Sequence, residues 1–258
     1  MNQSYITLFV LSAAAIVSGC VSNSTANLDQ SFDTEAEPVD SNLTGTSVLN
    51  DAFSDKPEAY NVEAKTRILF NTPVTSVRMN LSSSGEFLSN RSNITTTTNI
   101  GLGMTNETAD QVPEKTVETS GNTSTLRVTS GNGNTTTETV EAYSREDQGV
   151  SLEAFEAIEV QDAELLGATG ENNSRLLVEL ETESSDLVEN YESVMKAHAV
   201  SDEQSSMENQ EGLSEFNTSK AYIWVDRNQR NLERYSYYGS AVNGALQVRM
   251  DARFNIPQ

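Results

Sequence analysis

Apolar and polar residues alternate through most of the chain after Tyr60, and this alternation restricts the possible folds more than any other feature. In the segment 62–70, Ile68 and Phe70 fall on one side of the alternation, and charged residues such as Glu63 fall on the other. A period of two is the period of a β-strand with one buried and one solvated face. Similar segments recur at 77–81, 94–104, 123–129, 135–140, 221–225, 231–238 and 245–254. The chain is therefore predicted to be mainly β (α+β), with antiparallel strands.

Clusters of turn-forming residues indicate where these strands end. A turn is predicted from Ser82 to Gly85, and Gly131-Asn132-Gly133-Asn134 separates two alternating segments in the manner of a β-hairpin. A further turn is expected from Asp226 to Gln229. The segment 152–180 is less regular, and we interpret it as two strands that flank a loop from Gly167 to Ser174.

One amphipathic helix is predicted from about Asp186 to Ala199. Ser185 is placed to cap its first turn. The apolar stripe of this helix recurs with a period of 3.6 and consists of Leu187, Tyr191, Val194, Met195 and His198. Such a stripe is expected to lie across the sheet. A shorter helix is expected near Ser47 to Phe53.

Residues 1–19 have the features of a signal peptide. The run from Tyr5 to Val17 is mostly apolar and is too short to cross a bilayer as a permanent helix. It ends in Val17-Ser18-Gly19-Cys20, which matches the lipobox of lipoproteins: a branched apolar residue, two small residues and the cysteine that receives the lipid. No Lys or Arg precedes Cys20, so an uncleaved anchor with an unmodified cysteine is the alternative. Lipid on Cys20 would hold the protein on the outer, extracellular face of the cell membrane.

The rest of the chain is expected to consist of a tether and one domain. Residues 20–50 are rich in Ser, Asn, Thr, Asp and Glu, and their few apolar residues follow no period. Such a segment buries too little surface to offset its chain entropy, so a disordered acidic tether is predicted. Residues 51–258 are predicted to form a single β-rich domain. Cys20 is the only cysteine, so no disulfide can form within the chain.

The charge of the chain is strongly negative. It contains 38 acidic and 16 basic residues, which give a formal net charge of −22. The long-range field of such a surface repels nucleic acid and acidic lipid headgroups, so no nucleic-acid partner is expected. The even spread of the acids and the scarcity of lysine favour a halophilic source, in which salt screens the repulsion between carboxylates. An ordinary acidic extracellular protein is the alternative.

The order of these segments resembles the lipoprotein-localisation-factor superfamily, including its mycobacterial lipid-carrier lipoproteins. The closest part is Tyr222-Ile223-Trp224-Val225-Asp226-Arg227, followed by Leu232-Glu233-Arg234-Tyr235 and a last strand that ends in Phe254-Asn255. The resemblance implies a curved antiparallel sheet, or half-open barrel, with the amphipathic helix on its concave face. It also implies a cavity for lipid or acyl chains and no catalytic residues. The strands at 94–100 and 122–139 depart from this pattern because they are rich in Thr, Ser and Asn.

Two functions follow from these features. The first is a non-enzymatic binding protein that holds an apolar or lipid ligand in the half-barrel. The lining of that cavity would comprise Ile68, Phe70, Met79, Leu102, Leu180, Leu187, Tyr191, Met195, Trp224 and Val248. The second is a glycosylated cell-envelope module without a small-molecule site, which acts as a spacer or as a surface for an envelope protein partner. If the helix side chains fill the concave face, the second function is favoured.

No catalytic, metal or cofactor site is expected from the residue types present. His198, the only histidine, falls on the apolar stripe of the helix, where a packed imidazole is expected. Cys20 is assigned to the lipid, which removes the one candidate thiol nucleophile. Asn-x-Ser/Thr sequons are numerous, and those at Asn106, Asn134 and Asn172 are expected in loops, where glycans can attach.

Overall fold

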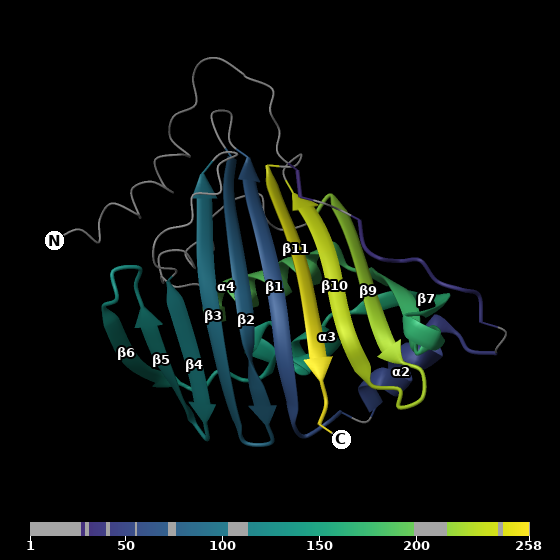
Figure 1. Cartoon of the computed structure of the whole chain (residues 1–258), viewed down its shortest axis with the longest axis horizontal. Helices are drawn as coiled ribbons and strands as arrows, with labels where there is room; N and C mark the ends of the chain where they lie inside the picture. The colour runs from purple at the N-terminus through teal and green to yellow at the C-terminus, as the bar shows by residue number, and fades with distance from the viewer. Residues whose placement is uncertain are drawn as a thin grey trace, which may run out of the picture.

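The computed structural model describes residues 27–28, 31–39, 42–54, 56–71, 76–102, 113–198, 216–241 and 245–257. Within these residues eleven strands form one antiparallel sheet, in the order β6-β5-β4-β3-β2-β1-β11-β10-β9-β8-β7 (Figure 1). The strands are β1 (Tyr60–Asn71), β2 (Ser76–Leu88), β3 (Arg91–Leu102), β4 (Glu114–Ser120), β5 (Thr123–Thr129), β6 (Thr135–Glu141), β7 (Val160–Thr169), β8 (Arg175–Thr182), β9 (Thr218–Asp226), β10 (Leu232–Ala241) and β11 (Leu246–Asn255). The helices are α2 (Gly45–Ser54), α3 (Leu152–Glu156) and α4 (Ser184–His198), with 3-10 turns at Glu146–Gln148 and Glu171–Asn173.

The sheet consists of two meanders that share one seam. Strands β1 to β6 follow one another in space as they do in sequence, and so do β7 to β11. The two series join because the first strand pairs with the last, from Asn61 opposite Asn255 to Phe70 opposite Leu246. The prediction of a mainly β, antiparallel fold is confirmed.

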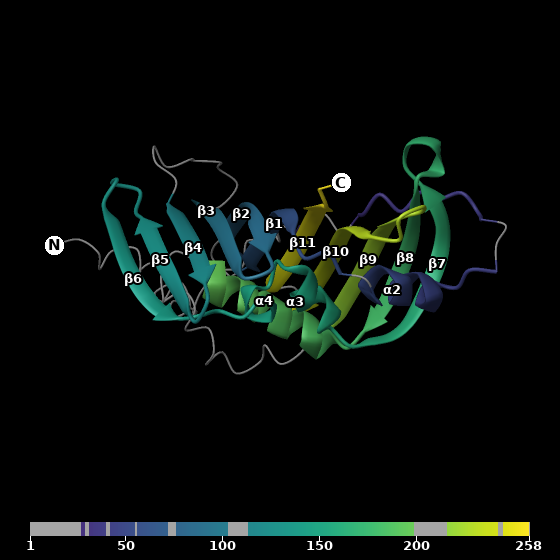
Figure 2. The ribbon, with the colours of Figure 1, turned by 90° about the horizontal axis from the view of Figure 1, so that it is seen from below.

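Alternation of side chains gives the sheet two different faces. In β1, Val62, Ala64 and Ile68 are buried, whereas Glu63 and Arg67 are exposed. The buried set packs in one large cluster with side chains of all three helices, and we call this side the helix-covered face. The opposite side is called the outer face. Figure 2 shows α3 and α4 on one side of the sheet, between its two curling ends.

Helix α4 crosses the helix-covered face. It contacts both β4 and β10, which lie five strand positions apart in the sheet. Five interstrand spacings amount to roughly 24 Å. A helix of 15 residues is about 22 Å long, so α4 can reach from one strand to the other only if it runs across the strands. The predicted helix is therefore present, but it begins at Ser184, which places Ser185 inside its first turn.

The predicted turn from Ser82 to Gly85 is wrong, because β2 continues through it to Leu88. Ser83 is tolerated inside the strand because its hydroxyl shares a hydrogen bond of 2.8 Å with Thr96 on β3. Gly85 is required for close approach: a Cβ at this position would lie 2.0 Å from the carbonyl oxygen of Asn93. Small residues here serve strand packing. The predicted loop after Gly167 is also shorter than expected, since β7 continues to Thr169.

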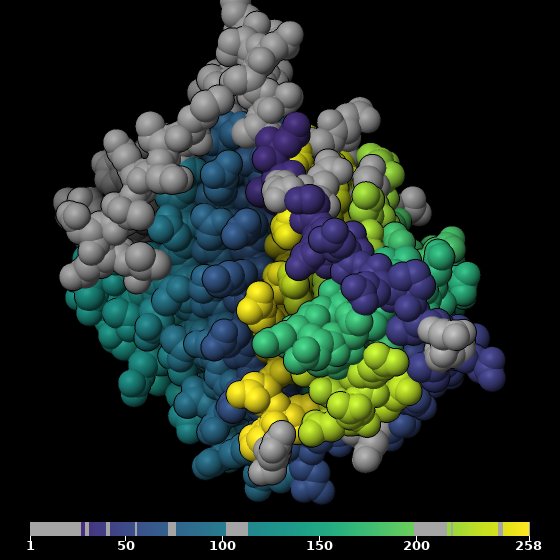
Figure 3. Space-filling model, turned by 45° about the vertical axis from the view of Figure 1, so that its right-hand side comes forward, coloured from purple at the N-terminus to yellow at the C-terminus, as the bar shows by residue number. Residues whose placement is uncertain are grey.

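Part of the expected tether lies against the sheet. Residues 45–50 belong to α2, whose N-terminus is closed by reciprocal hydrogen bonds between Thr44 and Ser47, both 3.1 Å long. Residues 31–39 run along the outer face, where Phe32 contacts Tyr222 with ring centroids 5.2 Å apart. Figure 3 shows this segment in purple, beside the yellow C-terminal strands. These contacts do not agree with a disordered tether that extends as far as residue 50.

Candidate functional site

Most of the residues predicted to line a cavity lie together on the helix-covered face. They are tightly packed there. Buried members of this cluster from the sheet are Ile68, Met79, Leu180 and Val248, and those from α4 are Leu187, Tyr191 and Met195. Phe70 is partly buried and packs against the same cluster. Leu102 ends β3, and its side chain lies outside the described part of the structure.

The assignment of Trp224 to this face is wrong. On β9 the side chains of Ala221, Ile223 and Val225 join the helix-covered cluster, so Trp224 must point to the outer face. There it packs with Leu177, and the guanidinium carbon of Arg234 lies 4.2 Å from the centre of its ring. Trp224 therefore belongs to the surface on which residues 31–39 lie.

Helix α4 fills the space that a ligand would need. The Tyr191 ring is 1% exposed, and Leu187 and Val194 are fully buried. Helix α3 fills the neighbouring part, since Phe155 stacks on Tyr235 with ring centroids 4.2 Å apart. Interdigitated side chains of this kind form a packed interior and not a cavity ready for a ligand.

Polar groups are nevertheless buried beneath α4. The hydroxyls of Tyr235 and Tyr237 have no hydrogen-bond partner among the described residues, and neither has the Oδ1 atom of Asn190 on α4 itself. Burial, followed by the charge of Asp186, raises the pKa of Tyr235 far above its ordinary value. Burial also raises the pKa of Tyr237, with smaller effects from Tyr235 and Tyr191. Buried polar groups of native proteins usually have a partner, so the two tyrosine hydroxyls mark a place suited to a polar ligand atom or to water. The hydroxyls of Thr98 and Ser236 are likewise buried without a partner among the described residues.

His198 is a structural group at the end of α4. Its side chain is fully buried, and its Nε2 atom donates to the carbonyl oxygen of Gln148 at 2.6 Å. Its Nδ1 atom then accepts from the hydroxyl of Thr96 at 3.2 Å. Burial lowers the pKa of His198 to about 4. The hydrogen bond to Gln148 opposes this effect in part, and the positive charge of Lys115 makes a smaller contribution that lowers the pKa further. A neutral imidazole that joins α4 to β3 fits the packed histidine expected from the sequence.

Protonation of His198 is expected to make the fold sensitive to acid. Below pH 6.5 the unfolded imidazole binds a proton, whereas the folded imidazole stays neutral until about pH 4, so stability falls as the pH falls through this window. The loss amounts to at most about 1.4 kcal/mol per pH unit. Denaturant unfolding at pH 7 and pH 4.5 should show that the stability advantage of the parent over His198→Gln shrinks by about 2 kcal/mol. An equal pH dependence in both proteins would contradict this role.

A second polar cluster attaches α3 to β1. Glu153 accepts hydrogen bonds from the Tyr60 hydroxyl and from Arg145 Nη1, each 2.7 Å long. Burial raises the pKa of Glu153, but the bonds from Arg145 and Tyr60 outweigh it and hold the pKa below its usual value. The Tyr60 hydroxyl also accepts from the backbone of Leu152 at 3.0 Å. These hydrogen bonds engage the side chains of Tyr60, Arg145 and Glu153 in fixing α3 to β1.

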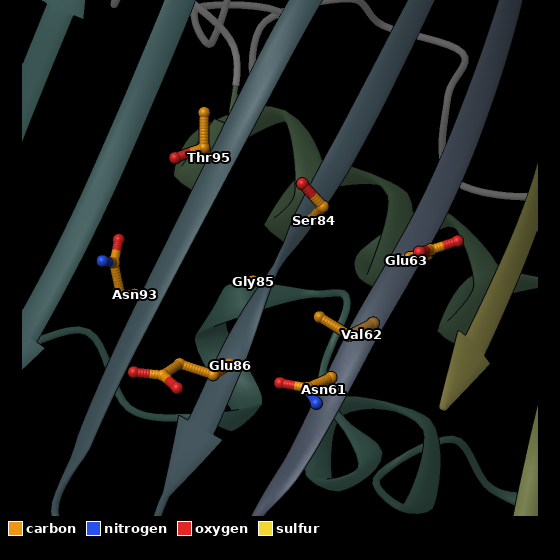
Figure 4. Close-up of a pocket in the computed structure, with 8 residues that line it drawn as sticks. All are labelled: Asn61, Val62, Glu63, Ser84, Gly85, Glu86, Asn93 and Thr95. Carbon is orange, nitrogen blue, oxygen red and sulfur yellow. The ribbon is translucent and has the colours of Figure 1, made fainter. Parts of the chain in front are cut away.

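A shallow groove lies on the outer face of β1, β2 and β3. Its lining is mostly polar and consists of Asn61, Val62, Glu63, Ser84, Gly85, Glu86, Asn93 and Thr95 (Figure 4). The helices lie behind the sheet in this view. Amides, hydroxyls and carboxylates on an open surface suit a polar partner, and they do not provide the apolar enclosure that a lipid chain requires.

The remaining predicted sites differ in how far the structure describes them. Cys20 and Asn106 lie outside the described residues. Asn134 is exposed in the turn between β5 and β6, and Asn172 is exposed between β7 and β8, so both are accessible to a glycan.

Of the helices described, none is both long and apolar enough to span a bilayer. No group of three or more His, Cys, Asp or Glu side chains within the described ranges is arranged to hold a metal ion.

Comparison with known proteins gives only a distant structural likeness. No family model matches the chain, and no curated protein matches its sequence. The fold is similar to the crystal structure of a DUF1329 family protein from Desulfovibrio piger, with a TM-score of 0.30 and 9% sequence identity. The match covers 83% of this chain and 93% of the other.

Proposed function

We propose that this chain is a non-enzymatic lipoprotein of the cell envelope, anchored through Cys20 on the extracellular side, which acts through the surface of its sheet. The observation that carries this proposal is the filled helix-covered face. Leu187, Tyr191 and Met195 occupy the space in which an apolar ligand would have to lie. The polar outer face, with its groove over β1 to β3, remains open to a partner.

An acidic exterior fits a protein that works outside the cell at high salt. The sequence contains 38 acidic residues, and screening by molar salt would relieve the repulsion among them. Exposed sequons at Asn134 and Asn172 suit a glycosylated surface. A halophilic source and glycosylation are therefore part of the same proposal.

A carrier of apolar or lipid ligands is the second candidate, and one observation favours it. The hydroxyls of Tyr235 and Tyr237 are buried beneath α4 without a partner among the described residues, and a ligand with a polar end could provide one if α4 moved aside. The open, curled sheet also suits a half-open barrel.

Native mass spectrometry of the protein extracted from its own membranes tests the proposal directly. The expected mass is that of the chain from Cys20 onward plus the covalent lipid, with glycans where they are attached. Because the interior is packed, no further apolar molecule should remain bound at low collision energy. A one-to-one complex with a noncovalent lipid would contradict the surface module and support the carrier.

A further inference from the structure

The start of the described chain is fixed to one end of the sheet. The backbone amide of Leu28 donates to Oε1 of Gln247 at 2.8 Å, and Nε2 of Gln247 donates to Oδ1 of Asn27 at 2.9 Å. Two residues further along β11, Arg249 Nη1 donates to the carbonyl oxygen of Ser31 at 2.7 Å. Leu28 is buried against Leu69 and Tyr238 on the outer face. This end of the sheet, at the top in Figure 1, is called the pinned end.

The distance from the lipid to the pinned end is therefore short. Seven residue steps separate Cys20 from Asn27, and an extended chain of that length reaches at most about 25 Å. A free tether as far as residue 50 would allow roughly 100 Å. With lipid on Cys20, as proposed above, the pinned end is the part of the domain held closest to the membrane.

The strands at the pinned end carry an unusual charge distribution. The band is formed by residues 66–71 of β1, 76–81 of β2, 97–102 of β3, 218–221 of β9, 236–241 of β10 and 246–250 of β11, which are joined by their registers. It contains Arg67, Arg78, Lys220 and Arg249 and no Asp or Glu. The other halves of the same strands contain Glu63, Glu86, Asp226, Glu233 and Asp251. Acidic residues of the flanking strands border the band, since Glu114 of β4 lies opposite Thr97 and Glu179 of β8 lies opposite Tyr222. The charged residues within the band itself are all positive.

Three of these cations form no ion pair with a described carboxylate. Among the described residues, no carboxylate forms an ion pair with Arg67, Arg78 or Lys220. Arg67 lies directly opposite Arg249 in the β1–β11 register, and like charges in that position are destabilising. At the other end of the sheet, Arg175 pairs with Glu233 and Arg234 pairs with Asp251.

We propose that the cationic band at the pinned end rests on the anionic headgroups of the membrane that holds the lipid of Cys20. This inference rests on the anchor in the proposed function and adds an orientation to it. Guanidinium groups form paired hydrogen bonds with phosphate oxygens, and each cation close to an anionic surface strengthens association by roughly fivefold. The repulsion expected from the net charge is a long-range effect. It is screened beyond about 10 Å even at 0.1 M salt, so contact depends on the charges that face the membrane.

The single cysteine of the chain makes the orientation measurable. With Cys20 lipidated, an introduced cysteine is a unique thiol for a fluorophore. Ser76 and Ser84 lie on the same face of β2, at the pinned end and toward the other end. They are separated by eight residues, or about 26 Å. The lipidated Ser76→Cys and Ser84→Cys proteins are placed in vesicles of phosphatidylglycerol and phosphatidylcholine, or of phosphatidylcholine alone, with a headgroup-bound quencher.

Quenching at position 76 is expected to exceed that at position 84 by at least about twofold in the anionic vesicles, and by less in the neutral ones. Arg67→Glu should remove most of the difference. Because this substitution places a carboxylate opposite Arg249, it should leave the melting temperature unchanged or raise it, so loss of folding cannot explain the result. Arg91→Glu, with the same change of charge at the other end of β3, is the control and should keep the difference.

Three results would overturn the inference: equal quenching at the two positions, no effect of Arg67→Glu, or the same difference in neutral and anionic vesicles. If the protein does not stay on vesicles at all, the proposed anchor fails instead. The two failures are therefore distinguished by whether the protein floats with the vesicles.

Discussion

Replacing Cys20 with Ser is expected to abolish the mature, membrane-bound form of the protein. The thiol is the only side chain of the sequence Val17-Ser18-Gly19-Cys20 that can take a thioether-linked lipid. Each buried methylene of a lipid chain contributes about 0.8 kcal/mol to membrane binding, so loss of the lipid lowers partitioning by many orders of magnitude. The Cys20→Ser protein should appear either as the unprocessed precursor or in the medium.

Membrane fractionation, intact mass and detergent partitioning measure this outcome. Ser18→Ala is the matched control, because it keeps a small residue in the segment that a peptidase would bind and should give normal mature protein. If Cys20→Ser yields membrane-bound protein with the same size and detergent partitioning as the parent, the lipoprotein hypothesis is wrong. A precursor-sized protein in the parent itself would indicate the uncleaved anchor.

The sequence predicts the strands well because strand alternation is a local property. β5 spans Thr123–Thr129 as expected, and β10 and β11 lie within a few residues of their predicted bounds. The prediction omitted β4 (Glu114–Ser120), whose inward residues are Lys115, Val117 and Thr119. Two of these three residues are polar, so β4 has no apolar alternation. The strand exists because β3 and β5 pair with it on both sides, which is a property of the whole sheet.

The local pattern does not show which side chains of β9 point to the helix-covered face and which point to the outer face. Ala221, Ile223 and Val225 would suit a buried face, and so would Tyr222 and Trp224. The choice between them depends on what covers the outer face, and residues 31–39 provide that cover. Phe32 and Ala36, the apolar residues of this segment that pack with Trp224, are isolated in a polar segment and follow no period. Contacts between isolated residues and a distant strand leave no periodic signal in the sequence.

The candidate site depends on the same distinction between pattern and packing. The apolar stripe of α4 was predictable from its period, and its position on the sheet followed from the need to bury it. Whether α4 fills the curved sheet or only closes a cavity depends on side-chain volumes from three helices and most of the strands. The cationic band was similarly hidden, because Arg67, Arg78 and Arg249 are brought together only by strand register.

Truncation of Tyr191 is expected to cause a large loss of stability with no change in bound lipid. The ring is 1% exposed and packs in the central cluster with Leu187 and Val194. Replacing a buried aromatic residue with Ala removes its apolar contacts and leaves a cavity, which together cost about 3 to 5 kcal/mol. For a domain of this size the melting temperature should fall by roughly 10 °C.

Two variants of α4 and a lipid measurement make this result specific. Tyr191→Phe keeps the ring and should cost much less stability, and Glu189→Ala, at an exposed position of the same helix, should stay within about 0.5 kcal/mol of the parent.

Lipid is extracted from the parent and from Tyr191→Ala and quantified per mole of protein. In a surface module neither sample contains noncovalent lipid, since Tyr191 belongs to a packed interior. In a carrier, Tyr191 would be one wall of a cavity that already exists, so its truncation would cost less stability and would change the amount or identity of the retained lipid. A small shift in melting temperature together with a change in the retained lipid would therefore refute the surface module. If truncation of the Tyr191 side chain costs little stability, its ring borders a cavity that already exists.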